Sequence, residues 1–111
     1  MPRDEDQTRL RRMLDSAEKA VMLSQSRNRQ DLDNDDLFSL AMTRLLEIIG
    51  EAAKTIGPEV REAYPQIPWR QIAGVRDRLI HGYFNVDLDV VWSILKQDLP
   101  PLVTQLRTVL E

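Results

Sequence analysis

The chain has 111 residues, of which 42% are hydrophobic and 30% are charged, and it contains no cysteine and one histidine. That length fits one domain, which we place over residues 1–111. The lack of cysteine excludes a disulfide framework, a thiolate metal site and a cysteine nucleophile, and one histidine excludes a multi-histidine metal centre within a single chain. No apolar run approaches the roughly 20 residues of a membrane span, and the charged N-terminus does not resemble a signal peptide. We therefore expect a cytoplasmic protein that uses no metal and no cofactor.

Arginine supplies most of the positive charge. Three of the 15 basic residues are lysine, which leaves 12 arginines, and the formal net charge is -3. An acidic protein does not attract nucleic acid by its overall charge. Binding of a polyanion would therefore need a local arginine cluster, whose planar guanidinium groups suit phosphate. The alternative is that the arginines reflect genome composition and surface salt bridges.

The first half of the chain predicts two long helices. The first covers roughly residues 4–26, where apolar residues recur at spacings of three and four. Residues 26–34 are almost entirely polar, which indicates a connection. The second helix covers about residues 35–56, with Asn34 or Asp35 as its N-cap.

The second predicted helix is the most apolar segment of the chain. Its apolar residues occupy more than one helix face: Leu37, Leu40, Ala41, Leu45, Leu46, Ile48, Ile49, Ala52, Ala53 and Ile56. This pattern is typical of a helix at the centre of a bundle or at a subunit interface. A polar stripe of Arg44, Glu47 and Glu51 interrupts it. The stripe is either a solvated Arg–Glu pair or part of a dimer cleft.

The second half predicts shorter helices separated by prolines and glycines. A helical turn is expected over residues 59–64, and a third helix runs from Pro68 to about Ile80. Asp87 can cap a fourth helix, which Pro100-Pro101 must break or kink before a last segment at 102–110. The predicted fold is all-α: an up-down four-helix bundle with a split last helix and a short helical turn before the third helix, without strands.

The segment 75–85 holds the densest group of reactive side chains. Its members are Arg76, Asp77, Arg78, His81 and Tyr83. On a continuous helix, Asp77 and His81 would share one face, whereas Arg76 and His81 would lie about 140° apart. Arg76 and His81 could meet one ligand only if they flank a cleft, or if the helix unwinds near Gly82.

This group has the outline of an RNA-cleaving site. Arginine can bind phosphate, and a histidine beside an aspartate can move protons near neutral pH. Attack by a ribose 2′-hydroxyl would leave a 2′,3′-cyclic phosphate and needs one proton removed and one delivered. A symmetric homodimer would supply two histidines for these steps. The structural alternative is a favourable histidine at a helix C-terminus, a surface Asp–His pair and an aromatic pair in the core.

A series of short sequences, in order along the chain, resembles one protein family. They are LEIIGEAAK at 46–54, IPW at 67–69, GVR at 74–76, HGYF at 81–84, VW at 91–92 and LP at 99–100. The pattern Arg76-x4-His81-x-Tyr83 looks like the Arg-x4-His-x-Tyr motif of the HepT family of HEPN-domain toxins. The similarity spans nearly the whole chain and is weakest before Leu37.

The resemblance implies a specific activity and partner. Members of this family form helical-bundle dimers with two Arg/His motifs in a shared cleft, and active members are metal-independent endoribonucleases. They are toxins of type II toxin–antitoxin systems, encoded beside a minimal nucleotidyltransferase antitoxin (MntA) that transfers AMP to the motif tyrosine. On this chain, Arg76 and His81 would be catalytic, Asp77 and Arg78 supporting, and Tyr83 the AMPylation site.

One position departs from the family pattern, and other functions stay open. Asp77 stands where the family usually has asparagine, and a carboxylate there weakens the local attraction for RNA phosphate. The main alternative is a non-catalytic, helical substrate-binding subunit of a two-chain nucleotidyltransferase, in which His81 is structural. A plain four-helix dimer would leave the motif unexplained. Trp69 and Trp92 are expected to anchor the core or an interface and not to stack on bases.

Overall fold

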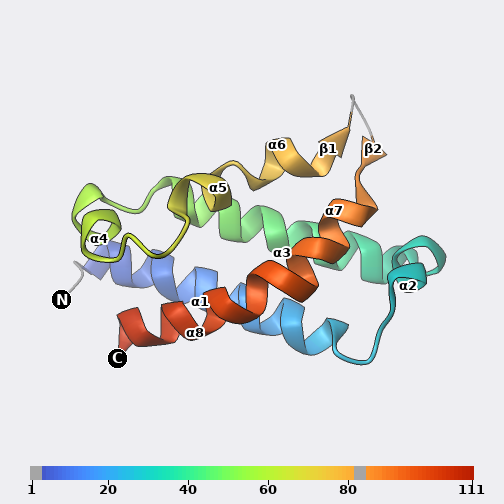
Figure 1. The fold of residues 1–111 in the computed structure, drawn as a ribbon, viewed down its shortest axis with the longest axis horizontal. Helices are drawn as coiled ribbons and strands as arrows, with labels where there is room; N and C mark the ends of the chain where they lie inside the picture. Colours follow the sequence, from blue (N-terminus) through green and yellow to red (C-terminus); the bar gives the residue numbers. More distant parts are fainter. Residues whose placement is uncertain (1–3, 82–84) are drawn as a thin grey trace.

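The computed structural model describes residues 4–81 and 85–111, and helices make up most of it (Figure 1). The helices are α1 (Asp4–Ser24), α2 (Arg29–Asn34), α3 (Asp36–Lys54), α4 (Pro58–Ala63), α5 (Trp69–Ala73), α6 (Val75–Leu79), α7 (Leu88–Ser93), the π-helix η1 (Ile94–Asp98) and α8 (Leu99–Leu110). The strands β1 (Ile80–His81) and β2 (Asn85–Val86) form a small antiparallel ribbon. The predicted all-α class is confirmed. None of the described helices is long and apolar enough to cross a membrane.

Helix α3 lies at the centre of the fold. It packs against α1 on one side and against α5 and α6 on another, while α8 lies along α1 (Figure 1). Apolar residues at helical spacing close the core between these helices, and Leu10, Met13, Met42, Leu46 and Leu106 are each almost completely buried. The central place predicted for this most apolar helix is confirmed.

The N-terminal turn of α1 is tied to the end of α3. The Asp6 carboxylate accepts a hydrogen bond from the Gly57 amide at 3.1 Å, and Asp6 is 7% exposed. Arg9 lies 3.6 Å from Asp6 and donates to the Thr55 carbonyl at 2.8 Å. These bonds satisfy backbone groups that the end of a helix leaves unpaired.

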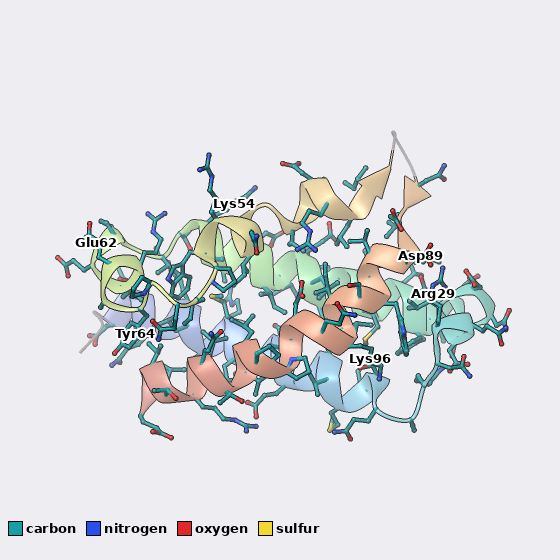
Figure 2. All side chains as sticks on the ribbon, viewed as in Figure 1. Arg29, Lys54, Glu62, Tyr64, Asp89 and Lys96 are labelled. Atoms are coloured by element: carbon teal, nitrogen blue, oxygen red, sulfur yellow. The ribbon has the colours of Figure 1, made fainter. Side chains whose placement is uncertain are left out.

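The segment expected to be a polar connection contains the short helix α2, which corrects that prediction. Asn28 and Asp31 form a capping box, and Leu32 is 1% exposed in the core. Arg29 bonds to Asp89 at 2.8 Å and so links α2 to α7 (Figure 2). The capping box and one buried leucine are sufficient to form this short helix. A single apolar residue gives no helical periodicity, so the sequence did not predict it.

Helix α3 begins as predicted, with Asp35 as its N-cap. The Asp35 side chain accepts a hydrogen bond from the Phe38 amide, and this bond, followed by the contact with Arg27, lowers the pKa of the carboxyl group. Phe38 and Met42 face the core, whereas Leu37 is 81% and Leu40 is 67% exposed. The apolar first half of α3 is therefore uncovered on its outer side in the single chain.

The predicted third helix is broken into α5 and α6, which meet at Gly74, and α6 ends at Leu79. This corrects the prediction of one helix to Ile80. The junction packs closely on α3, because a Cβ added to Gly50 would lie 2.5 Å from a methyl group of Val75. The chain then forms the β1–β2 ribbon, which corrects the prediction of a fold without strands; the sequence has only weak strand character there, around Val86.

The fourth helix starts where predicted and ends differently. Asp87 accepts hydrogen bonds from the amides of Asp89 and Val90. Pro100-Pro101, expected to break or kink the helix, instead follows the wider π turn η1, in which the Leu99 amide bonds to the Ile94 carbonyl. The prolines lack an N–H, and the helix absorbs that loss by a local change of hydrogen-bond spacing.

Candidate functional site

Arg76 stands on the exposed side of α6 and faces α3. Its side chain is 64% exposed, and its Nε atom lies 4.0 Å from a carboxylate oxygen of Glu47. Glu47 is less exposed, at 27%, because it lies between the two helices. A guanidinium in this position is open to an anionic ligand while a neighbouring carboxylate holds it near α3.

His81 does not share a helix face with Asp77. Helix α6 has ended before His81, whose backbone belongs to β1 opposite Asn85, so the i, i+4 relation expected of Asp77 and His81 is wrong. The Asp87 amide closes the ribbon by donating to the Leu79 carbonyl at 2.6 Å. The ribbon projects from the end of the bundle beyond α6 (Figure 1). The motif therefore crosses from a helix to an extended segment, and Tyr83, the predicted modification site, lies outside the described residues.

The polar side chains of the stripe on α3 form ion pairs. Arg44 and Glu51 form an ion pair at 3.2 Å, and both side chains are 58% exposed. Glu47, between them on the same face, is the residue that approaches Arg76. The solvated Arg–Glu pair, one of the two alternatives for this stripe, is therefore present, and the stripe also borders Arg76 within the same chain. The Glu47–Arg76 contact joins residues far apart in the chain, and the sequence held no signal for it.

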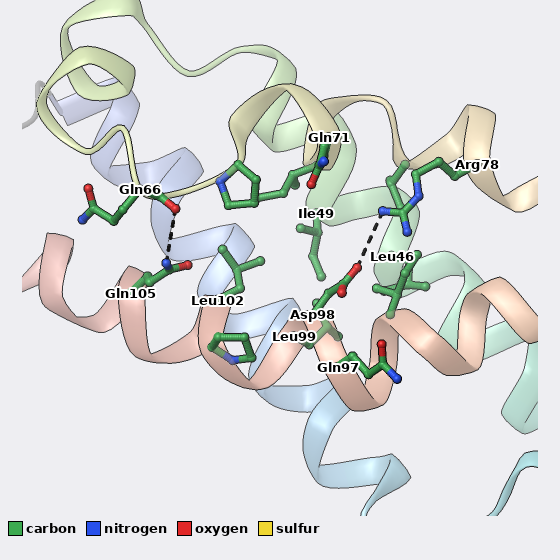
Figure 3. Close-up of a pocket in the computed structure, with 15 residues that line it drawn as sticks. Leu46, Ile49, Gln66, Gln71, Arg78, Gln97, Asp98, Leu99, Leu102 and Gln105 are labelled. Carbon is green, nitrogen blue, oxygen red and sulfur yellow. Dashed lines mark hydrogen bonds and ion pairs between the residues drawn. The ribbon is translucent and has the colours of Figure 1, made fainter.

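Arg78, which was predicted to support catalysis together with Asp77, points away from Arg76 and Glu47. It reaches across to Asp98 of η1, at 3.6 Å, on the side of α6 that faces α8 (Figure 3). Asp77 is exposed on α6. The structure therefore separates Arg76 from Arg78, which the sequence had grouped as phosphate ligands.

A cavity that the sequence did not predict lies beside Arg78. Its volume is about 310 Å³, and it opens between α5 and α6 on one side and η1 and α8 on the other (Figure 3). Leu46 and Ile49 from α3 form part of its lining. Sequence reasoning missed it because its lining comes from five helices and from the loop before α5.

Trp69 and Trp92 have structural positions, as expected. Trp69 is 7% exposed and donates from its indole nitrogen to the Tyr64 carbonyl at 3.0 Å. Trp92 is half-buried, with the Lys96 ammonium over its ring. Trp69 therefore anchors α5 in the core, and Trp92 packs beside the C-terminal end of α1, whose Ser24 carbonyl accepts a hydrogen bond from Lys96.

The chain matches a known protein family over most of its length. A model of the family described as ribonuclease HepT-like matches residues 13–109. The match covers most of the chain, from within α1 to the end of α8, and includes the segment from Arg76 to Tyr83. The chain belongs to the HepT-like ribonuclease family.

Individual relatives support this membership. A protein of Thermococcus cleftensis named as a probable ribonuclease HepT is 47% identical over 73 residues, 66% of each chain. A provisionally named RNase of Methanocaldococcus jannaschii, MJ1216, is 32% identical over 111 residues, which is 100% of this chain and 92% of the relative. A provisionally named RNase of Caldanaerobacter subterraneus subsp. tengcongensis is 40% identical over 82 residues, 74% of this chain and 73% of the relative. No solved structure gave a significant match.

Proposed function

We propose that this protein is a metal-independent endoribonuclease whose catalytic residues are Arg76 and His81. The observation that carries the proposal is the exposed Arg76 guanidinium beside α3, on the helix that leads into the ribbon containing His81, in a chain of the HepT-like family. RNA is the substrate that the family membership supports. A guanidinium suits the charge that develops on a scissile phosphate.

The proposed reaction is an internal transesterification. The ribose 2′-hydroxyl attacks the adjacent phosphorus, the bond from phosphorus to the 5′-oxygen breaks, and the products are a 2′,3′-cyclic phosphate and a 5′-hydroxyl. The imidazole of His81 takes up or delivers a proton. One histidine cannot do both in a single step, so a second copy of the chain supplies the other.

The proposed assembly is a homodimer with both motifs in one groove. Its support is the outer side of α3, where Leu37 and Leu40 are exposed, together with Ile80 of β1, which is 40% exposed. From the Glu47–Arg76 contact, α6 and β1 run toward this first half of α3 (Figure 1). Exposed large apolar side chains of this kind are typical of a protein–protein interface.

The biological role that we propose is that of a toxin in a type II toxin–antitoxin system. A minimal nucleotidyltransferase antitoxin of the MntA kind would transfer AMP from ATP to the Tyr83 hydroxyl and release pyrophosphate. The added phosphate would repel RNA from Arg76 by like charge. Intact-mass measurement after incubation with such an enzyme and ATP should show added AMP that Tyr83→Phe does not accept.

The main test is cleavage of RNA by the purified protein in EDTA. Arg76→Ala and His81→Ala should each lower the rate about 100-fold or more, since removal of one charge-stabilising group in an active site costs about that much. Arg61→Ala, an exposed arginine on α4, is the matched control and should cleave like the wild type. Circular dichroism should show equal helix content in all variants.

Two results would contradict the proposal. One is a requirement for a divalent metal, and the other is full activity in both variants. A wild-type protein that binds RNA or nucleotide without cleaving it would instead support the non-catalytic subunit of a nucleotidyltransferase.

A further inference from the structure

The cavity between α6 and α8 has a lining of unusual composition. Leucine and isoleucine side chains of α3 and α8 form its floor, and Pro68 and Pro101 lie on opposite walls. The polar groups around it are mostly uncharged amides: Gln66, Gln71, Gln97 and Gln105 (Figure 3). Its volume of about 310 Å³ is at the small end of the range for ligand pockets.

The charges at the cavity cancel each other. Arg78 and Asp98 are its only charged lining residues among those that the structure describes, and they face each other at 3.6 Å. A phosphate or a metal ion would find no unpaired charge of the required sign here. The lining therefore favours a neutral ligand with apolar faces and hydrogen-bonding edges.

We infer that this cavity binds an RNA nucleobase. A base is flat, so it can lie against the aliphatic floor and the two proline rings, and it carries both donors and acceptors on its edge. A glutamine amide offers one donor group and one acceptor, the pair that the edge of adenine requires. Gln71 and Gln97 come from opposite walls, so they can contact a base from two sides (Figure 3).

The position of the cavity connects this inference to the proposed ribonuclease function, on which it rests. Arg76 and Arg78 lie on the same short helix and face different sides of it. A helix with its side chains is about 10–12 Å across, so one strand of RNA can pass around α6 and place a flanking base in the cavity. Proteins that recognise single-stranded RNA bind bases that are unstacked in this way. The cavity would then select the sequence near the cut.

The π turn η1 helps to form this site. It contains Gln97 and Asp98, and the wider hydrogen-bond spacing ends at Leu99, just before the two prolines. Single π turns are often found at functional sites. In this chain the π turn directs the Asp98 carboxylate toward Arg78 of α6, and Gln97 lies beside it in the lining of the cavity (Figure 3).

The test uses nucleosides, because they contain a base and no phosphate. Adenosine, guanosine, cytidine and uridine are titrated into the isotope-labelled protein, and the side-chain amide signals of the four glutamines are followed by NMR. Adenosine should shift these signals most strongly. The variant Gln71→Ala/Gln97→Ala should bind adenosine about 5- to 10-fold more weakly, the effect expected from losing one or two neutral hydrogen bonds.

The control variant is Gln25→Ala/Gln30→Ala, which removes two exposed glutamines outside the cavity and should leave adenosine binding unchanged. No shift at millimolar nucleoside, or shifts confined to residues around Arg76, would overturn the inference. Uridine binding as tightly as adenosine would overturn the assignment of adenine. Because these measurements need no cleavage, they separate a failed base site from a failed ribonuclease proposal.

A second measurement applies to cleavage by the active enzyme. The sites cut in a mixed-sequence RNA should become less selective in Gln71→Ala/Gln97→Ala than in the control variant Gln25→Ala/Gln30→Ala. An unchanged cleavage pattern in Gln71→Ala/Gln97→Ala would also count against the base site.

Discussion

At the scale of single residues, the contact between Glu47 and Arg76 matters most. A carboxylate 4.0 Å from an exposed guanidinium has two opposing effects. It orients the arginine, and it competes with any phosphate that the arginine binds. Both side chains remain accessible to water, so the net attraction is small, as in most exposed ion pairs.

We predict that Glu47→Gln binds RNA more tightly than the parent protein. The amide keeps the size of the side chain but removes the negative charge beside Arg76. The gain should be about two- to fivefold, because exposed ion pairs contribute up to about 1 kcal/mol. Binding is measured by fluorescence anisotropy in the His81→Ala background, so that RNA is not cut.

Glu62→Gln is the control for this experiment. It removes an exposed carboxylate from α4, at the end of the molecule opposite the ribbon (Figure 2). Its effect on RNA binding should be smaller than that of Glu47→Gln and should disappear as salt is raised, because distant charges act only through the long-range field. Weaker RNA binding by Glu47→Gln would show that the carboxylate chiefly orients Arg76.

At the scale of secondary-structure elements, the close packing of α3 against the α5–α6 junction positions Arg76. Gly50 allows this approach, since a Cβ there would meet the Val75 side chain at 2.5 Å and the Ile72 carbonyl at 3.1 Å. Val75 begins the helix that carries Arg76. A displacement of this junction therefore changes the position of the guanidinium relative to Glu47.

We predict that Gly50→Ala destabilises the protein by about 1–3 kcal/mol, the usual cost of an added methyl group in a packed core. Urea unfolding measures the change in free energy. Val75→Ala in the same chain should recover part of the loss, because it removes the methyl group that the new Cβ would meet. The two substitutions should therefore be non-additive. If the two losses in unfolding free energy simply add, a clash with Val75 is not the cause of the destabilisation by Gly50→Ala.

At the scale of the whole molecule, the proposed dimer depends on the uncovered face of α3. Leu37 and Leu40 are among the most exposed large apolar side chains described, at 81% and 67%. They lie one helical turn apart at the start of α3, so they form a continuous apolar surface. The proposed two-histidine mechanism needs a second chain on this side.

We predict that Leu37→Glu/Leu40→Glu converts a dimer to a monomer in sedimentation velocity at micromolar concentration. The helix content should be kept, because both side chains point to water within one chain, and RNA cleavage should fall with dimerisation. Met22→Glu is the control, since Met22 is 61% exposed on α1. A wild-type monomer, or a double variant that stays dimeric, would contradict this interface.

The local features of this protein could be predicted from its amino-acid sequence. Apolar spacing set the extent of α1 and α3, Asp35 and Asp87 capped the helices where expected, and the motif from Arg76 to Tyr83 indicated the family. These features depend on residues within a few positions of one another, so helical periodicity and capping chemistry are sufficient to predict them.

The way in which these elements meet could be seen only in the three-dimensional fold. It ended α6 at Leu79, placed His81 in a ribbon, set Glu47 against Arg76, and turned Arg78 toward Asp98. The Glu47–Arg76 and Arg78–Asp98 contacts depend on packing between segments that are distant in the chain, whereas the ribbon pairs Ile80 with Val86 nearby. Helical periodicity predicts that a face will be buried but does not identify the residue that buries it. For that reason the motif could be read from the sequence, whereas its charged neighbour and the adjoining cavity could not.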